Sequence, residues 1–223
     1  MNITKMVTIA LVCVASFCSA MKPGPPQILT CPHCGQTKEI MSLCSGNTFR
    51  AKYWSDNKRI APMLPEISHV QKCSHCKKYF ILSRQKAVYA KSGHSPDRGL
   101  LSFAEMKEAF TQLSQEKFLN KQEEAAVRMM LHHAYNDYYF RDGSHRTVAA
   151  ADQKLFQENA LWLIGNLITD NVMKAEFYRE IGDMEKAEAL IEKETGDNAF
   201  TKKLVVTIKE KINKGDTAVF LIK

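Results

Sequence analysis

The rhythm of apolar and polar positions changes near residue 100. Between residues 28 and 91, apolar residues come in short runs separated by Gly, Pro, Asn and Asp. This pattern predicts short strands joined by turns, with no long helix before residue 100. The preceding stretch at 22–27, KPGPPQ, contains three prolines and is expected to form a stiff linker without regular structure.

Beyond residue 100, apolar residues recur three and four positions apart, which is typical of amphipathic helices. Ser102 and Glu105 form a capping-box pattern, Asn120 can cap a second helix, and Asp197 can cap the last one. We expect helices at 102–116, 121–140, 150–168 and 198–213. The third of these is apolar around most of its circumference, so it should lie at the centre of the helical core.

Two further elements are expected toward the C-terminus. Residues 171–194 predict a helical hairpin that turns at Gly182-Asp183. Its small residues, tyrosine and turn glycine are TPR-like, but the pattern occurs only once, and solenoids usually need three or more repeats. The hairpin is therefore expected to belong to a compact bundle. The last segment, 217–223, predicts a short strand that pairs with the N-terminal region.

The first 20 residues allow two interpretations. Lys5, the apolar run that ends at Cys18, and the small residues Ser19 and Ala20 are typical of a secretory signal peptide. Alternatively, translation starts at Met21 and the preceding residues are an over-extended reading frame. The chain is then cytoplasmic, whereas a true signal peptide makes it secreted or periplasmic. Because the apolar run is shorter than the roughly 20 residues that span a bilayer, no transmembrane segment is expected in the mature chain.

Composition and charge exclude little. With 45% hydrophobic and 25% charged residues, the chain is neither collagen-like nor disordered in composition. The net charge of +7 permits contact with nucleic acid or anionic lipid. However, the basic residues are spread along the chain, whereas nucleic-acid-binding faces need clustered charge. A solvated basic surface is the simpler interpretation.

The strongest chemical signal is a pair of CxxC motifs, CPHC at 31–34 and CSHC at 73–76. Two residues between cysteines let both sulfurs of a tight turn point toward one centre, and two such turns complete the tetrahedral four-thiolate site that zinc accepts. Such a site has no open coordination position, so it stabilises structure and does not activate water. The predicted ligands are Cys31, Cys34, Cys73 and Cys76.

Other interpretations of these cysteines stay open. Iron binds the same four ligands in rubredoxin-like sites. Disulfides or a redox CxxC become relevant if the protein is exported, although a redox CxxC normally opens a helix and neither motif does. His33 and His75 lie inside the motifs and are expected to point away from the metal. Lys77 stands where the first motif has Gly35, which should make the second turn less favourable.

Several other residues are weaker candidates. His133 and Asp137 are four residues apart, next to His132, so a second metal site is an alternative, but a packing or surface role is favoured. Cys44 is interpreted as a buried or idle thiol and not as a nucleophile. No phosphate-binding glycine loop, catalytic carboxylate pair or Ser-His-Asp motif is apparent. Lys38 and the lysines near the second motif are expected to balance the charge of the thiolates. The predicted binding surface comprises Lys72, Lys77, Lys78, Trp54 and Arg59, with Asp56 and Pro62 beside them.

The motifs ILTCPHCG, MSLxSGNTF, YWSDxKxIAPMLPE and VQKCxHC resemble those of a group of bacterial proteins from Bacteroides-type genomes. The likeness covers nearly the whole chain from Met21 onward. It implies an N-terminal zinc ribbon with the two CxxC pairs as ligands and a TPR-like helical tail, and it brings no activity. Members typically begin near MKPGPP, which supports the later start. This chain departs from the pattern at Cys44, which leaves open which four sulfurs bind.

These observations predict an α+β fold with a four-cysteine zinc ribbon at 21–92 and an all-helical bundle with a C-terminal strand at 93–223. The expected cofactor is one structural zinc ion. The leading functional prediction is a zinc-dependent scaffold or adaptor that binds another protein. A nucleic-acid-binding zinc ribbon is the alternative, and an enzyme that uses the 47–66 segment ranks third.

Overall fold

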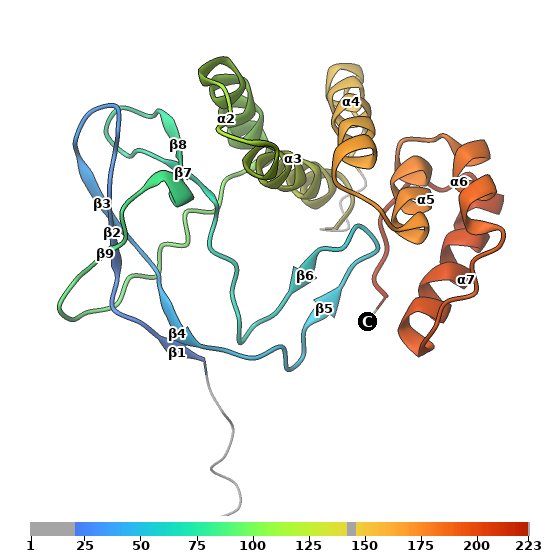
Figure 1. Cartoon of the computed structure of the whole chain (residues 1–223), viewed down its shortest axis with the longest axis horizontal. Coiled ribbons are helices and arrows are strands. Elements are labelled where there is room, and N and C mark those ends of the chain that lie inside the picture. The colour runs from blue at the N-terminus through green and yellow to red at the C-terminus, as the bar shows by residue number, and fades with distance from the viewer. Residues whose placement is uncertain (1–20, 142–145, 223) are drawn as a thin grey trace, which may run out of the picture.

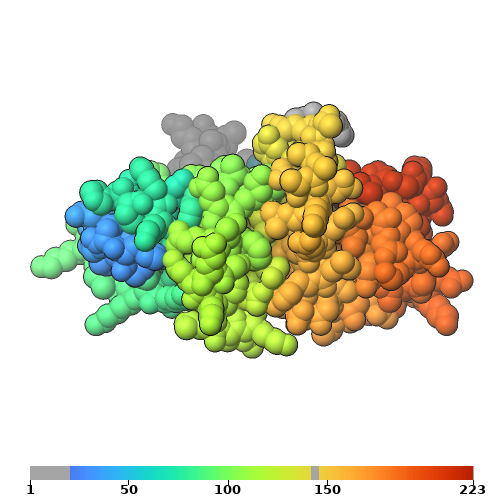
Figure 2. All heavy atoms as spheres, turned by 90° about the horizontal axis from the view of Figure 1, so that it is seen from above, coloured from blue at the N-terminus to red at the C-terminus, as the bar shows by residue number. Residues whose placement is uncertain are grey.

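The structure is a computed structural model that describes residues 21–141 and 146–222. The expected signal peptide or over-extended start therefore lies outside the described residues. Short strands occupy one end of the molecule and helices the other, as Figure 1 shows. The space-filling view from above shows the same order from the N-terminal blue to the C-terminal red along the long axis (Figure 2).

The N-terminal part is built from small antiparallel strand groups. Pro23 takes part in the first of them, although residues 22–27 were expected to lack regular structure; a two-residue pairing with a register shift tolerates a proline. Strands β3, β2 and β9 form a three-stranded sheet, and β1–β4, β5–β6 and β7–β8 form pairs. The bounds are β1 (Lys22–Pro23), β2 (Gln27–Thr30), β3 (Thr37–Ile40), β4 (Leu43–Ser45), β5 (Lys52–Tyr53), β6 (Arg59–Ile60), β7 (Val70–Lys72), β8 (Tyr79–Ile81) and β9 (Val88–Tyr89).

The C-terminal part is helical, as the periodicity predicts. Ser102 and Glu105 form the expected capping box, and the Asn120 side chain accepts a hydrogen bond from the backbone of Glu123. The last helix is capped by Asn198 and not by Asp197, because the Asn198 side chain reaches the first turn's amides. The bounds are α2 (Phe103–Glu116), α3 (Lys121–Asn136), α4 (Ala150–Asn166), α5 (Asn171–Glu180), α6 (Met184–Ile191) and α7 (Ala199–Asn213).

The second expected helix does not continue to residue 140 as an α-helix. After Asn136 it widens into a π-helical turn at Asp137–Arg141. Such turns are rare and often lie at functional positions. Here the wider turn places the Arg141 guanidinium against the His133 carbonyl and the Asp137 carboxylate.

One hydrophobic core joins the strands to the helices. Val70, Tyr79 and Ile81 of the β7–β8 pair pack with Met106 of α2 and Leu131 of α3. Hydrogen bonds reinforce the contact, because the side-chain amide of Gln112 exchanges two with the backbone of Tyr79. Residues on both sides of the predicted domain boundary, between residues 92 and 93, therefore belong to one core.

The helices themselves pack in sequence order, with α4 between α3 and α5. The α5–α6 hairpin turns at Gly182-Asp183 as expected, and its apolar face is covered by α7. No helix in the described ranges is long and apolar enough to cross a membrane.

The C-terminal strand is smaller than expected. It forms a single bridge between Leu221 and Trp54, flanked by backbone hydrogen bonds from Ile222 to Tyr53 and from Ser55 to Phe220. Its partner is the segment between the two CxxC motifs and not the ribbon sheet. The pairing is short because the chain turns immediately after β5, at Trp54–Asn57, with Asn57 at a positive φ of 65°. The bridge still ties the end of the chain to its N-terminal half (Figure 1).

Candidate metal centre and polar network

The two CxxC motifs sit in the turns of two hairpins, β2–β3 and β7–β8. Both turns have the same backbone hydrogen bonds. The Cys31 amide donates to Gln36 and its carbonyl accepts from Gly35, while Cys73 makes the matching bonds with Lys78 and Lys77. Each CxxC is thus held in the same tight turn, which directs both of its sulfurs toward the opposite hairpin.

The sulfur positions fit a tetrahedral metal. The Sγ atoms of Cys31 and Cys76 lie 3.6 Å apart, as do those of Cys34 and Cys73, and all four ligand atoms lie within 4.8 Å of one another. Zinc–sulfur bonds of about 2.3 Å in a tetrahedron place the sulfurs about 3.8 Å apart, whereas a disulfide requires about 2.05 Å. The four cysteines are free thiols and can hold a metal ion.

The surroundings of the sulfurs also favour a cation. Cys31 and Cys73 are buried with Leu29, Ile40 and Phe80 in a small core. Burial raises the pKa of Cys31 to about 12. Burial also opposes ionisation of Cys73, but the backbone amides of Cys76 and His75 and the neighbouring thiols lower its pKa to about 6. Amides that point at sulfur are suited to thiolates, and a divalent cation would allow all four to ionise together.

The second turn shows the strain that its sequence predicts. Gly35 has a φ of 74°, and Lys77, at the corresponding position, has a φ of 61°. A side chain disfavours this left-handed conformation, whereas glycine adopts it freely. Lys77 therefore accepts a backbone cost to keep the turn that places Cys73 and Cys76.

Of the lysines expected to balance the charge of the thiolates, two form ion pairs with carboxylates and two are exposed. Lys72 forms an ion pair with Glu105 at 2.9 Å, and this hydrogen bond raises the pKa of Lys72. Lys38 pairs with Asp97 at 3.2 Å. Lys77 and Lys78 stay exposed. The sequence predicts Lys72 to belong to a basic surface at this turn, but its charge is paired with Glu105 of α2.

The two histidines inside the motifs are exposed as expected, whereas Cys44 is not buried. His33 and His75 are exposed, and the His33 Nε2 lies 3.0 Å from the Tyr79 carbonyl. Cys44 is exposed on β4 and does not belong to the sulfur cluster. The sulfur set is therefore the one formed by the two CxxC motifs.

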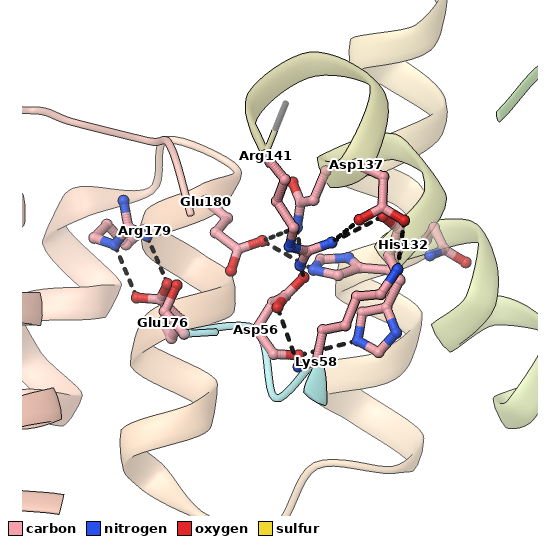
Figure 3. A network of polar contacts seen from close by, with 12 residues as sticks. Asp56, Lys58, His132, Asp137, Arg141, Glu176, Arg179 and Glu180 are labelled. Atoms are coloured by element: carbon pink, nitrogen blue, oxygen red, sulfur yellow. Dashed lines mark hydrogen bonds and ion pairs between the residues drawn. The ribbon is translucent and has the colours of Figure 1, made fainter. Parts of the chain in front are cut away.

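A second arrangement, which the sequence does not reveal, lies where the 47–66 segment meets α3 and α5. Figure 3 shows its charged residues converging from three elements. Asp56 is fully buried and not an exposed recognition residue as expected, because its carboxylate pairs with Arg141 and accepts a hydrogen bond of 3.0 Å from Asn136. The Asp56 carbonyl accepts from His133 at 3.2 Å.

The possible second metal site is not assembled, because its members have other partners. Asp137 pairs with Lys58 and, at 2.6 Å, with Arg141. His132 lies between the rings of Phe156 and Phe177, at centroid distances of 4.6 and 4.2 Å. Both histidines therefore serve packing and the junction with the 47–66 segment.

Glu180 connects this junction to α5. Its Oε2 lies 2.9 Å from His132 Nε2 and accepts from Asn136 at 3.0 Å. Burial raises the pKa of Glu180 well above its ordinary value and lowers the pKa of His132 to about 3. Both shifts favour the uncharged form of the group, because an uncharged group is less costly to remove from water than an ion.

Arg179, the residue before Glu180, forms a fully buried ion pair with Glu176, one turn earlier on α5, through two hydrogen bonds of 2.8 and 2.6 Å. Arg179 also donates to the Asp216 carbonyl. The sequence contains one sign of this network: the buried charged residues of α5 are spaced so that they lie on the same face of the helix as its apolar residues. The partner residues could not be identified, because they lie far away along the chain.

Of the two candidate binding residues in the 47–66 segment, Trp54 is half-buried and Arg59 is exposed, and both line a pocket of about 620 Å³. Lys72, Lys77 and Lys78 do not line it. The predicted binding surface is therefore two separate regions, one at the second CxxC turn and one at this pocket. Comparisons with protein-family models, curated proteins and solved structures found no match to this chain.

Proposed function

We propose that the chain is a binding module whose N-terminal part is organised by one structural zinc ion. The observation that carries this proposal is the closed set of four cysteine sulfurs. Four protein ligands leave a tetrahedral metal no position for water or substrate, so the ion would stabilise the fold and not catalyse a reaction. Four thiolates from two hairpin turns accept zinc or iron, and we propose zinc, the usual ion of structural four-cysteine centres; metal analysis distinguishes the two.

The zinc ion would act on more than the two turns. Cys73 and Cys76 lie between β7 and β8, and these strands share their core with α2 and α3. Metal binding would therefore stabilise the contact between the strand region and the helices. Because structural zinc contributes on the order of 10–16 kcal/mol of apparent binding energy in small peptides, removal of the ion should destabilise the whole molecule.

The partner we propose is another protein. The α5–α6 hairpin, the TPR-like part of the sequence, packs its apolar face on α7, and a recess lined by Ile191 and Ile212 stays open between α6 and α7. Charged side chains of Glu188 and Lys209 border it. The recess is small, and its two isoleucines are 1% and 7% exposed, so a partner would bind mainly through the charged side chains around it.

Nucleic acid is the second candidate, supported by the exposed Lys77 and Lys78. The ion pair between Lys72 and Glu105 weakens the case for nucleic acid, because a lysine that is paired with a carboxylate contributes less to phosphate binding. Salt titration separates the two candidates. Binding through phosphate contacts weakens steeply with salt, whereas docking through the few charged side chains around the α6–α7 recess should weaken less steeply.

The zinc proposal is tested by metal analysis and by cobalt substitution. We expect one zinc ion per purified chain and, with cobalt, the visible absorption of a tetrahedral thiolate complex. Cys73→Ser should abolish both and lower the melting temperature, and Cys44→Ser should change neither. The proposal fails if the purified protein holds no stoichiometric metal, or if Cys44→Ser loses the ion as Cys73→Ser does.

A further inference from the structure

A pocket of about 620 Å³ lies between the β5–β6 hairpin, the segment at 61–66 and the π-helical turn. Its volume falls within the range of roughly 300–1,000 Å³ that is typical of small-molecule sites. The pocket is lined by an unusual number of cations. We refer to it as the basic pocket, and its cations are Arg50, Lys52, Lys58, Arg59, Arg98 and Arg141.

These charges are not balanced inside the pocket. Six cations face two lining carboxylates, Glu66 and Asp137, and a third carboxylate, that of the buried Asp56, pairs with Arg141 from behind, which leaves an excess of three positive charges. Asp137 is already shared between Lys58 and Arg141. The other four cations have no carboxylate partner within residues 21–141 and 146–222. Like charges gathered in a recess repel one another, and a bound anion would relieve that repulsion.

Two residues that line the basic pocket each have a hydrogen-bond donor without an acceptor. The Trp54 Nε1 and the Arg141 Nε are buried and have no hydrogen-bond partner in the described part of the chain, and both residues line the basic pocket. A buried donor without an acceptor is unfavourable. Because both atoms are buried, a phosphate oxygen would accept from them only when the Trp54 and Arg141 side chains turn toward the pocket.

Arg141 is held beside the basic pocket before any ligand arrives. Its side chain is only 4% exposed, and it is held by Asp56 and Asp137 while its guanidinium lies 5.3 Å from the centre of the Trp54 ring. A site built on such a group binds with a smaller entropic cost of ordering it. The pocket wall therefore combines one buried, ion-paired guanidinium with four exposed cations, Arg50, Lys52, Arg59 and Arg98.

We propose that the basic pocket binds a small organic phosphate. Arginine forks match phosphate oxygens, and the excess of three positive charges suits a multiply charged group. Ile60 and Leu100, which are 43% and 49% exposed, together with Trp54 offer an apolar surface to the organic part. This site is separate from the sulfur cluster and from the α6–α7 recess, so the inference goes beyond the proposed zinc-dependent protein binding.

The test uses the full zinc-loaded chain with Trp162→Phe, so that Trp54 is the only tryptophan and its fluorescence reports on the pocket. The probes are phenyl phosphate, inorganic phosphate, benzoate and oligothymidylate. We expect saturable binding of phenyl phosphate, weaker binding of inorganic phosphate and still weaker binding of benzoate. Calorimetry with the unmodified chain provides the same affinities without the fluorescence reporter.

The charge variants decide between a built site and general basicity. Lys52→Gln with Arg59→Gln should weaken phenyl phosphate binding by at least about tenfold, because each charge-assisted hydrogen bond is worth that much or more. Lys78→Gln with Lys86→Gln removes the same charge from exposed positions outside the pocket and should leave binding unchanged. Zinc content and thermal unfolding of each variant show that the fold is intact.

Several outcomes would overturn the proposal. The absence of saturable phenyl phosphate binding at millimolar concentration rules out the site. Equal weakening by both double variants shows a general charge effect. Benzoate that binds as tightly as phenyl phosphate removes the preference for phosphate. Oligothymidylate that binds more tightly than phenyl phosphate and is lost with Lys52→Gln and Arg59→Gln assigns the basic pocket to nucleic acid. None of these results depends on the protein partner, so the two proposals fail independently.

Discussion

Asp56 and Asp137 pair with the same guanidinium, that of Arg141, but in very different surroundings. The side chain of Asp56 is fully buried, whereas that of Asp137 is 43% exposed. Asp56→Ala would leave the buried Arg141 with one partially hydrated partner and would also remove a hydrogen bond to Asn136. Breaking a buried ion pair costs about 3–5 kcal/mol. Because Asp137 stays in place, we expect a loss of unfolding free energy near the lower limit, about 3 kcal/mol.

Asp137→Ala is the matched control. It removes a carboxylate from the same arginine, but exposed pairs contribute only about 0–1 kcal/mol. Both variants and the wild type are compared by urea unfolding at saturating zinc, so that metal loss does not contribute. The reasoning is refuted if the Asp56 variant loses less than about 1 kcal/mol, or if the Asp137 variant loses as much as the Asp56 variant.

Two further predictions concern backbone strain and pH. Lys77→Gly should raise the unfolding free energy by about 1 kcal/mol, because glycine adopts the positive φ of this turn freely; Gly35→Ala should lower it by a similar amount, and opposite signs would contradict the turn geometry. Burial raises the pKa of Glu180 above its ordinary 4.5, so its neutral form favours folding at low pH and this contribution is lost as pH rises through the folded pKa. Relative to Glu180→Gln, the unfolding free energy of the wild type should therefore fall by about 1.4 kcal/mol per pH unit from pH 4.5 upward. Urea unfolding of both proteins at several pH values measures this difference. A difference that does not change with pH would mean that Glu180 is ionised in the folded protein.

Local features of the sequence were enough to predict most helices and the cysteine cluster. Ser102 with Glu105 defines the start of α2, and Asn120 the start of α3, because a cap and the amides it binds lie within three residues of each other. The CxxC spacing works in the same way, since each turn is formed within a few residues. Joining the two turns into one cluster required only the preference of a metal for four ligands.

What only the tertiary structure decided depends on residues that are distant along the chain. Asp56, Arg141 and Glu180 meet because the 47–66 segment packs between α3 and α5, and no local pattern contains that information. The same packing buries Asp56 and gathers the cations of the basic pocket beside the π-helical turn. Apolar periodicity shows which face of an element is buried, but the partner of a buried charge is set by topology, and that is determined only when the whole chain has folded.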